Sequence, residues 1–122
     1  MDIHQILNNT PSLISRKAEE AEGLRLKWKE AINEYEHREA GYVLTLKAQQ
    51  DIKSTEIKFY VNDNGELFNS RMNLIRLEAD YRKKEAEIKG LEEELNSAKM
   101  SARIQIAEMS NLGFNAGNQK EE

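Results

Sequence analysis

Cysteine is absent from the 122-residue chain, and proline and tryptophan each occur once. Without cysteine, the chain can form neither disulfides nor metal sites with thiolate ligands. One proline and six glycines are too few for the many turns that a β-sandwich needs. No run of about 18 apolar residues is present, so we expect no transmembrane helix.

The N-terminal residues, Met1-Asp2-Ile3-His4, also lack the basic region and the apolar stretch of a signal peptide. The absence of cysteine is compatible with a reducing compartment. We therefore expect a cytoplasmic protein, located in the host cytoplasm if a phage encodes it.

Charged residues make up 33% of the chain, and the net charge is −4. Residues 11–53 and residues 70–112 each hold eight basic and eight acidic side chains. Mixed charge of this kind is typical of solvated helix faces. Apolar residues are scarce for a compact core, and the composition suits long helices packed along a narrow seam better. We predict an all-α fold of a single helical domain, residues 1–112.

The first long helix is predicted from about residue 11 to residue 52. Thr10 can cap it, and Pro11 at its first position loses no hydrogen bond. Residues 1–9 are compatible with a docking turn or a brief helix. The first long helix has an apolar spine that repeats every seven residues: Ile14, Ala21, Trp28, Tyr35 and Tyr42. Gly23 and Gly41, inside this stretch, are candidate bends or close-approach points.

Residues 54–65 interrupt the helical pattern. The preferred prediction is a short helix through Val61 and then a turn, with Asp63 capping the next helix and Glu66 completing the capping box. The alternative is a β-hairpin within residues 54–68, in which an Asn-Gly turn joins two short strands.

The second long helix is predicted over about residues 66–111, with an end at Gly113 and a disordered tail over residues 113–122. Two rows of apolar residues run along this helix, a main row and a partner row beside it. The partner row consists of Leu77, Leu91 and Ala98 and is broken by Lys84 and Gln105. The main row repeats every seven residues and forms a heptad seam. This seam, for the hairpin or for an oligomer, consists of Leu74, Tyr81, Ile88, Leu95, Ala102 and Met109.

The matched lengths of the two helices favour an antiparallel, coiled-coil-like hairpin with a short helix or turn as connector. A hairpin leaves a second apolar flank without a partner: Ile75, Met100, Ile104 and Ile106. This flank suggests helices from other copies, so we expect a homo-oligomer. Alternatively, these residues merely widen the seam of the hairpin.

Residues for catalysis or metal binding are scarce. His4 and His37 are far apart in the sequence, so no two histidines have the spacing of paired metal ligands. No phosphate-binding glycine loop is present. The carboxylates of Glu92-Glu93-Glu94 point in different directions on a helix, so they cannot converge on one metal. We expect no enzymatic activity, no metal, no cofactor and no small-molecule substrate.

Basic residues next to aromatic rings give a local signal for nucleic-acid binding. Such groups offer charge for phosphates and ring faces for bases. Trp28 itself lies on the apolar spine, which favours a packing role. The candidate phosphate contacts are Arg25, Lys27, Lys29, Lys47 and Lys53.

The connector resembles the central region of the UvsY family of recombination mediators from T-even-like phages. The matching stretches are Leu46-Lys47-Ala48, Lys53-Ser54-Thr55-Glu56-Ile57-Lys58, Val61 and Asp63, with a late Ser101-Ala102-Arg103. The resemblance covers roughly residues 28–110. It implies a ring-forming helical protein that binds single-stranded DNA, a recombinase and a single-strand-binding protein. Lys47 matches a basic position linked to DNA in that family, whereas the family's next basic position is occupied by Gln49 in this chain.

The leading hypothesis is therefore a non-enzymatic accessory protein of phage DNA recombination or replication, a recombination mediator that binds single-stranded DNA and a recombinase or single-strand-binding protein. The alternative is a coiled-coil module that binds only protein, either as a phage inhibitor of a host protein or as a structural scaffold. The acidic net charge and the run Glu92-Glu93-Glu94 suit this alternative.

Overall fold

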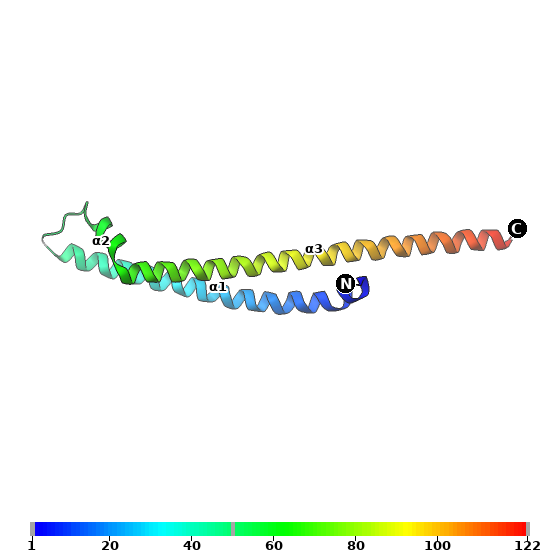
Figure 1. Ribbon diagram of the computed structural model, residues 1–122, viewed down its shortest axis with the longest axis horizontal. Helices are drawn as coiled ribbons and strands as arrows, with labels where there is room; N and C mark the ends of the chain where they lie inside the picture. Colours follow the sequence, from blue (N-terminus) through cyan, green and yellow to red (C-terminus); the bar gives the residue numbers. More distant parts are fainter. Residues whose placement is uncertain (1, 50, 122) are drawn as a thin grey trace. The chain divides into compact units, whose positions relative to one another are not determined.

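The computed structural model describes the backbone of residues 2–49 and 51–121, and the side chains of these residues up to 112. It contains helices α1 (Ile3–Ala48), α2 (Ile57–Asp63) and α3 (Gly65–Glu121), drawn in Figure 1. No strand is present within these ranges. The prediction of an all-α helical hairpin is confirmed, because the two long helices pack against each other.

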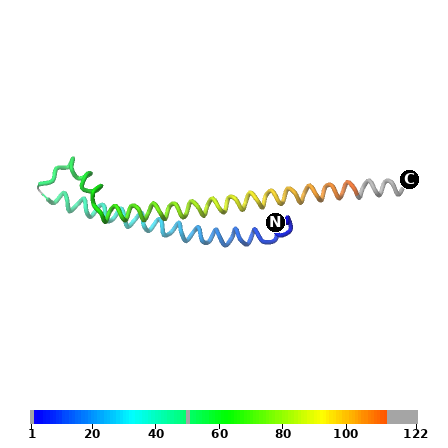
Figure 2. The backbone as a smooth tube through the Cα atoms, viewed as in Figure 1, coloured from blue at the N-terminus to red at the C-terminus, as the bar shows by residue number. Residues whose placement is uncertain are grey.

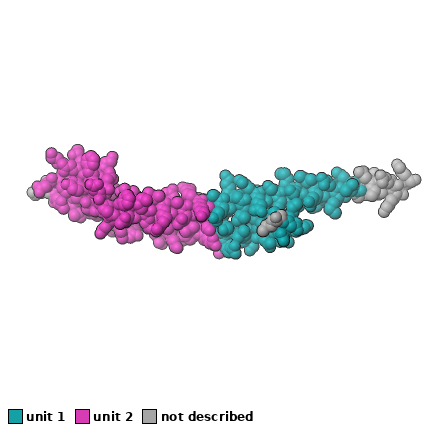
Figure 3. Space-filling model, in the orientation of Figure 1, with its two compact units in different colours: residues 1–18, 86–122 teal, residues 19–85 magenta. Residues whose placement is uncertain are grey.

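Two compact units divide the chain, one formed by residues 1–18 and 86–122 and the other by residues 19–85 (Figure 3). In the first unit, the Lys17 ammonium lies 3.1 Å from a Glu87 carboxylate oxygen. In the second, Lys84 lies 3.0 Å from Glu20, and Arg71 Nε donates to the Tyr35 hydroxyl. Within each unit, therefore, a stretch of α1 runs antiparallel to a stretch of α3, as the tube in Figure 2 traces.

Most of the buried residues are small, and two of them, Ala21 and Ala98, lie on rows that the spacing predicts. Among the described side chains, the most buried apolar residues are three alanines and two leucines: Ala21, Ala31, Leu46, Leu67 and Ala98. The small side chains of the three alanines let two helix backbones approach closely. The larger residues of the spine are only partly covered, because two helices cannot enclose a side chain on all sides.

Helix α1 begins earlier and ends earlier than predicted. It starts at Ile3 rather than at Pro11, and it ends at Ala48 rather than near residue 52. The cap is Asp2, whose side-chain oxygen accepts the His4 amide at 3.2 Å. Pro11 consequently lies inside the helix, and Thr10 is buried instead of capping. Proline removes one hydrogen bond and bends a helix, and Figure 1 shows the first turns of α1 bending away from the rest.

The connector is helical, so the alternative of a β-hairpin is wrong for this segment. The capping residue of α3 is not Asp63, which is the last residue of α2. Instead, the Asn64 side-chain oxygen accepts the Leu67 amide at 3.0 Å, and Gly65 becomes the first helical residue. The cap of α3 thus lies one residue later than the sequence predicts, since Asn caps a helix as well as Asp does.

Two expectations about glycine also need correction. Gly23 and Gly41 lie within α1, and a Cβ added to either would meet nothing within 4 Å. Neither glycine is therefore a close-approach point. Helix α3 continues past Gly113 to Glu121, where an end and a disordered tail were predicted. One glycine costs about 1 kcal/mol in a helix and does not by itself end it. Glu122 lies outside the described residues.

Candidate nucleic-acid interface

Trp28 of α1 is part of the packing between α1 and α3. Its ring stacks on Tyr81 with the ring centroids 5.7 Å apart and an angle of 26° between the planes. Lys29 Nζ lies 4.7 Å from the Trp28 ring centroid, and the Arg82 guanidinium lies 5.6 Å from it. Both contacts have cation–π geometry. The ring is therefore already occupied by protein groups and offers little face to a base.

Arg25 is held by a carboxylate on its own helix. It makes two hydrogen bonds to Glu22, at 2.7 and 3.0 Å. The hydrogen bond from Arg25 lowers the pKa of the Glu22 carboxyl, and the same bond raises the pKa of Arg25. Desolvation raises the pKa of the neighbouring Tyr81 hydroxyl, and a hydrogen bond involving Glu85 raises it further. Of the three basic candidates around Trp28, Lys27 is the one that is exposed and makes no hydrogen bond, ion pair or ring contact among the described residues.

Lys47 lies in a different and more basic setting. Together with Lys58 of α2 and Arg71 of α3, it lines an open groove of about 650 Å³. Glu39 is the one carboxylate among the described residues of its lining. We call this the connector groove; its remaining lining residues are Tyr35, Val43, Ser54, Ile57, Val61 and Asn62. Lys53, also exposed, directly precedes Ser54 in the chain.

Exposed aromatic rings accompany this basic groove. Phe59 and Tyr60 follow Lys58 in α2 and are 70% and 43% exposed, and Phe68 of α3 is 50% exposed. Arg71 stays beside Tyr35, with its guanidinium 5.7 Å from the ring centroid. None of the three exposed rings is part of the groove lining, whose aromatic residue is Tyr35. The connector region thus offers basic charge in the groove and exposed rings outside it, whereas the Trp28 ring is already in contact with protein groups.

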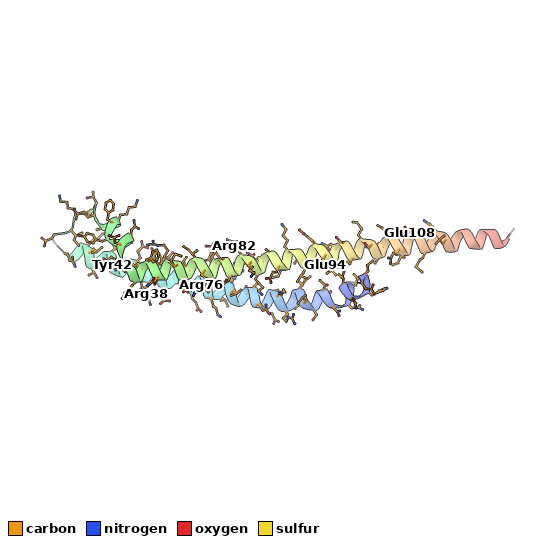
Figure 4. The ribbon with its side chains drawn as sticks, in the orientation of Figure 1. Arg38, Tyr42, Arg76, Arg82, Glu94 and Glu108 are labelled. Carbon is orange, nitrogen blue, oxygen red and sulfur yellow. The ribbon has the colours of Figure 1, made fainter. Side chains whose placement is uncertain are left out.

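A second hollow in the same unit is less suited to an anion. It measures about 750 Å³ and includes Glu34, Arg38, Tyr42 and Glu66 in its lining. Arg38 and Tyr42, labelled in Figure 4, both come from α1. The Arg38 guanidinium is bonded to Glu34 at 2.7 Å and to the Ser70 hydroxyl at 3.0 Å. Its charge is thus already compensated.

The candidate phosphate contacts therefore fall into two groups. Arg25, Lys27 and Lys29 lie on α1 near Trp28, whereas Lys47 and Lys53 lie at or next to the connector groove. Sequence reasoning missed Lys58, Phe59 and Arg71 as candidates. The signal for Lys58 was available, because this residue ends the connector stretch in which the family resemblance is best.

The predicted seam of the second long helix lies along the hairpin as far as Ala102. Lys84 interrupts the partner row of Leu77, Leu91 and Ala98, but this side chain is only 21% exposed and its ammonium lies 3.0 Å from Glu20 of α1. Met109 differs from the other members, because it is 71% exposed. The members that are partly covered are Leu74, Tyr81, Ile88, Leu95 and Ala102.

Within the described residues, no helix is long and apolar enough to cross a membrane. In the same ranges, no three His, Cys, Asp or Glu side chains gather where they could hold a metal ion. Comparisons with protein-family models, with curated proteins and with solved structures find no match to this chain. The resemblance to the UvsY family thus stays a prediction from the sequence.

Proposed function

We propose that this chain is a non-enzymatic accessory protein of phage DNA recombination that binds single-stranded DNA through the connector groove. The observation that carries the proposal is the composition of that groove. Lys47, Lys58 and Arg71 line it together with one carboxylate, Glu39. The exposed Phe59 follows Lys58 in α2 but lies outside the lining. A partner recombinase or single-strand-binding protein is part of the proposal on the strength of the family resemblance alone.

Single strands suit this surface better than duplex DNA does. Proteins that bind single strands without sequence preference combine a basic groove for the backbone with aromatic rings for the bases. The exposed rings of Phe59 and Tyr60 lie on α2, the seven-residue helix that also carries Lys58, at positions outside the groove lining. With three cations in the groove, we expect weak binding by one chain and a salt slope of about −2 for single-stranded DNA.

Self-association belongs to the same proposal. A homo-oligomer would repeat the connector groove and let one strand of DNA engage several copies, which raises the overall affinity without any new contact. It would also cover apolar side chains that a single hairpin leaves exposed near the end of the described part of α3, such as Ile106.

The proposal is tested by titrating the full-length chain into a fluorescent single-stranded oligonucleotide at about 50 and about 200 mM salt. Expected is saturable binding at low salt that weakens by about tenfold or more at high salt, because bound cations release counterions from the DNA. A correctly folded chain that shows no binding at low salt would remove the DNA claim.

The rival function, a module that binds only protein, is favoured by a different surface. Phe68, Met72 and Ile75 follow one another at helical spacing on α3 and are about half exposed. Met72 and Ile75, with Arg76, line a shallow hollow of about 520 Å³. An amphipathic partner helix could occupy such a hollow. Retention of a defined protein by this chain after nuclease treatment, without any oligonucleotide binding, would favour the rival.

A further inference from the structure

The α1–α3 seam continues along α3 beyond the point where α1 can cover it. Ala98 is buried and Ala102 is partly covered, but every residue from 103 to 112 is exposed. Met109 follows Ala102 by one heptad, and Leu112 follows Ala98 by two. Together with Ile106 they form an apolar stripe, which we call the open seam. Its three side chains are 64%, 71% and 69% exposed, in the order Ile106, Met109, Leu112.

Charges of opposite sign border the open seam. Successive residues of an α-helix are rotated by about 100° about the helix axis. Viewed down this axis, Arg103 therefore lies about 120° to one side of Met109, and Glu108 lies about 100° to the other side. Lys99 falls on the same side as Arg103, and Glu94 on the same side as Glu108. Glu94 and Glu108 are labelled on α3 in Figure 4. None of these four charges has an ion-pair partner among the described residues.

We propose that the open seam is an interface between copies of this chain, in which the segments run parallel around a common axis. Continuity with the α1–α3 interface argues for a helix as occupant, since the same heptad spacing that packs against α1 goes on past it. This inference deepens the self-association that the proposed function includes, and names its surface.

The two charged borders select the parallel arrangement. When parallel copies turn the same stripe toward one axis, the basic border of each faces the acidic border of the next. Arg103 then lies on the side of Glu108 of the neighbouring copy. In an antiparallel pair that shares this stripe, like charges would face each other, which is unfavourable.

The experiment measures the mass of the full-length chain in solution by light scattering, over a range of concentrations. The wild-type chain is expected at a multiple of 14.1 kDa. A double variant of the stripe, Ile106→Glu with Met109→Glu, is expected at the monomer mass. The matched control, Ile104→Glu with Met100→Glu, changes the same residue types on the opposite side of the helix and is expected to keep the wild-type mass.

A charge exchange tests the orientation. Arg103→Glu places two acidic borders together and is expected to raise the midpoint concentration of assembly by about tenfold at low salt. Adding Glu108→Arg restores opposite charges and is expected to restore the wild-type midpoint. Circular dichroism checks that each variant remains helical, which is expected because residues 103–112 are all exposed.

Three results would overturn the inference: a monomeric wild-type chain, equal effects of the stripe variant and its control, or no rescue by the second charge change. None of the substituted residues lines the connector groove. The oligonucleotide titration is therefore run on the same variants. DNA binding by a chain that does not assemble would leave the proposed function standing while the inference fails.

Discussion

At the scale of single residues, Trp28 is a structural residue rather than a DNA-stacking platform. The sequence leaves both roles open, because a tryptophan flanked by Arg25, Lys27 and Lys29 also fits a nucleic-acid site. Its position on a seven-residue spine favours packing, and its stack on Tyr81 shows how the packing is made. A spacing pattern can predict which side of a helix a residue lies on, but not which partner ring it meets.

Replacing Trp28 by alanine is expected to lower the free energy of unfolding by about 3 kcal/mol, the lower end for such a change because the ring is only partly buried. Urea denaturation followed by circular dichroism measures this. The affinity of the folded variant for single-stranded DNA is expected to stay unchanged. A stable variant that has lost DNA binding would contradict the assignment of Trp28 to packing.

The pair of Glu22 and Arg25 makes a separate prediction about pH. Because the folded-state pKa of Glu22 lies below its reference value of 4.5, the pair stabilises the fold above that pH and ceases to do so as the pH falls through the lowered pKa. NMR titration of the Glu22 carboxyl is expected to show a midpoint below 4.5 that rises in Arg25→Ala. An unchanged midpoint in that variant would mean that Arg25 is free in solution.

At the scale of helices, the sequence predicts the seam far better than the helix ends. The seven-residue repeat identifies the covered side of both long helices, because burial depends on many residues at once. An end depends on one capping side chain. Asp2 and Asn64 cap the helices where Thr10 and Asp63 were expected, and several residues in each region have the right chemistry.

Asn64→Ala tests the revised cap of α3. The variant loses the side-chain acceptor for the Leu67 amide and is expected to lower the free energy of unfolding by about 1 kcal/mol in chemical denaturation. Asp63→Ala, one residue earlier, is the matched control and is expected to cost less. A larger loss for Asp63→Ala would place the cap back at the residue that the sequence predicted.

Gly23→Ala and Gly41→Ala are expected to stabilise the protein by up to about 1 kcal/mol each. Both glycines lie within α1, and a methyl group at either position meets nothing within 4 Å. Alanine restricts the unfolded chain and favours the helix. Thermal unfolding is expected to shift upward in each variant. A downward shift would show that another chain approaches the backbone closely at that glycine.

At the scale of the whole molecule, the sequence predicts the basic character of the proposed DNA site but only some of its residues. Lys47 comes from the sequence, whereas Lys58 and Arg71 join it only because α2 and α3 bring distant residues to one groove. Lys53, also predicted, directly precedes the lining residue Ser54. Arg25 and Lys29 are equally good candidates in the sequence, yet Arg25 is already bound to Glu22 and Lys29 already lies over the Trp28 ring. Local charge compensation of this kind depends on side-chain geometry, which composition does not contain.

The central claim is that the connector groove binds single-stranded DNA. Its most direct test compares the salt-dependent affinity of the wild-type chain with two double variants that remove equal charge. Lys47→Ala with Lys58→Ala, in the groove, is expected to weaken binding at low salt about tenfold or more and to lower the magnitude of the salt slope by about 1.4, or about 0.7 for each lysine. Lys27→Ala with Lys83→Ala, both exposed and outside the groove lining, is expected to change the affinity about twofold or less. Equal losses in the two variants, or a larger loss in the second, would contradict the account.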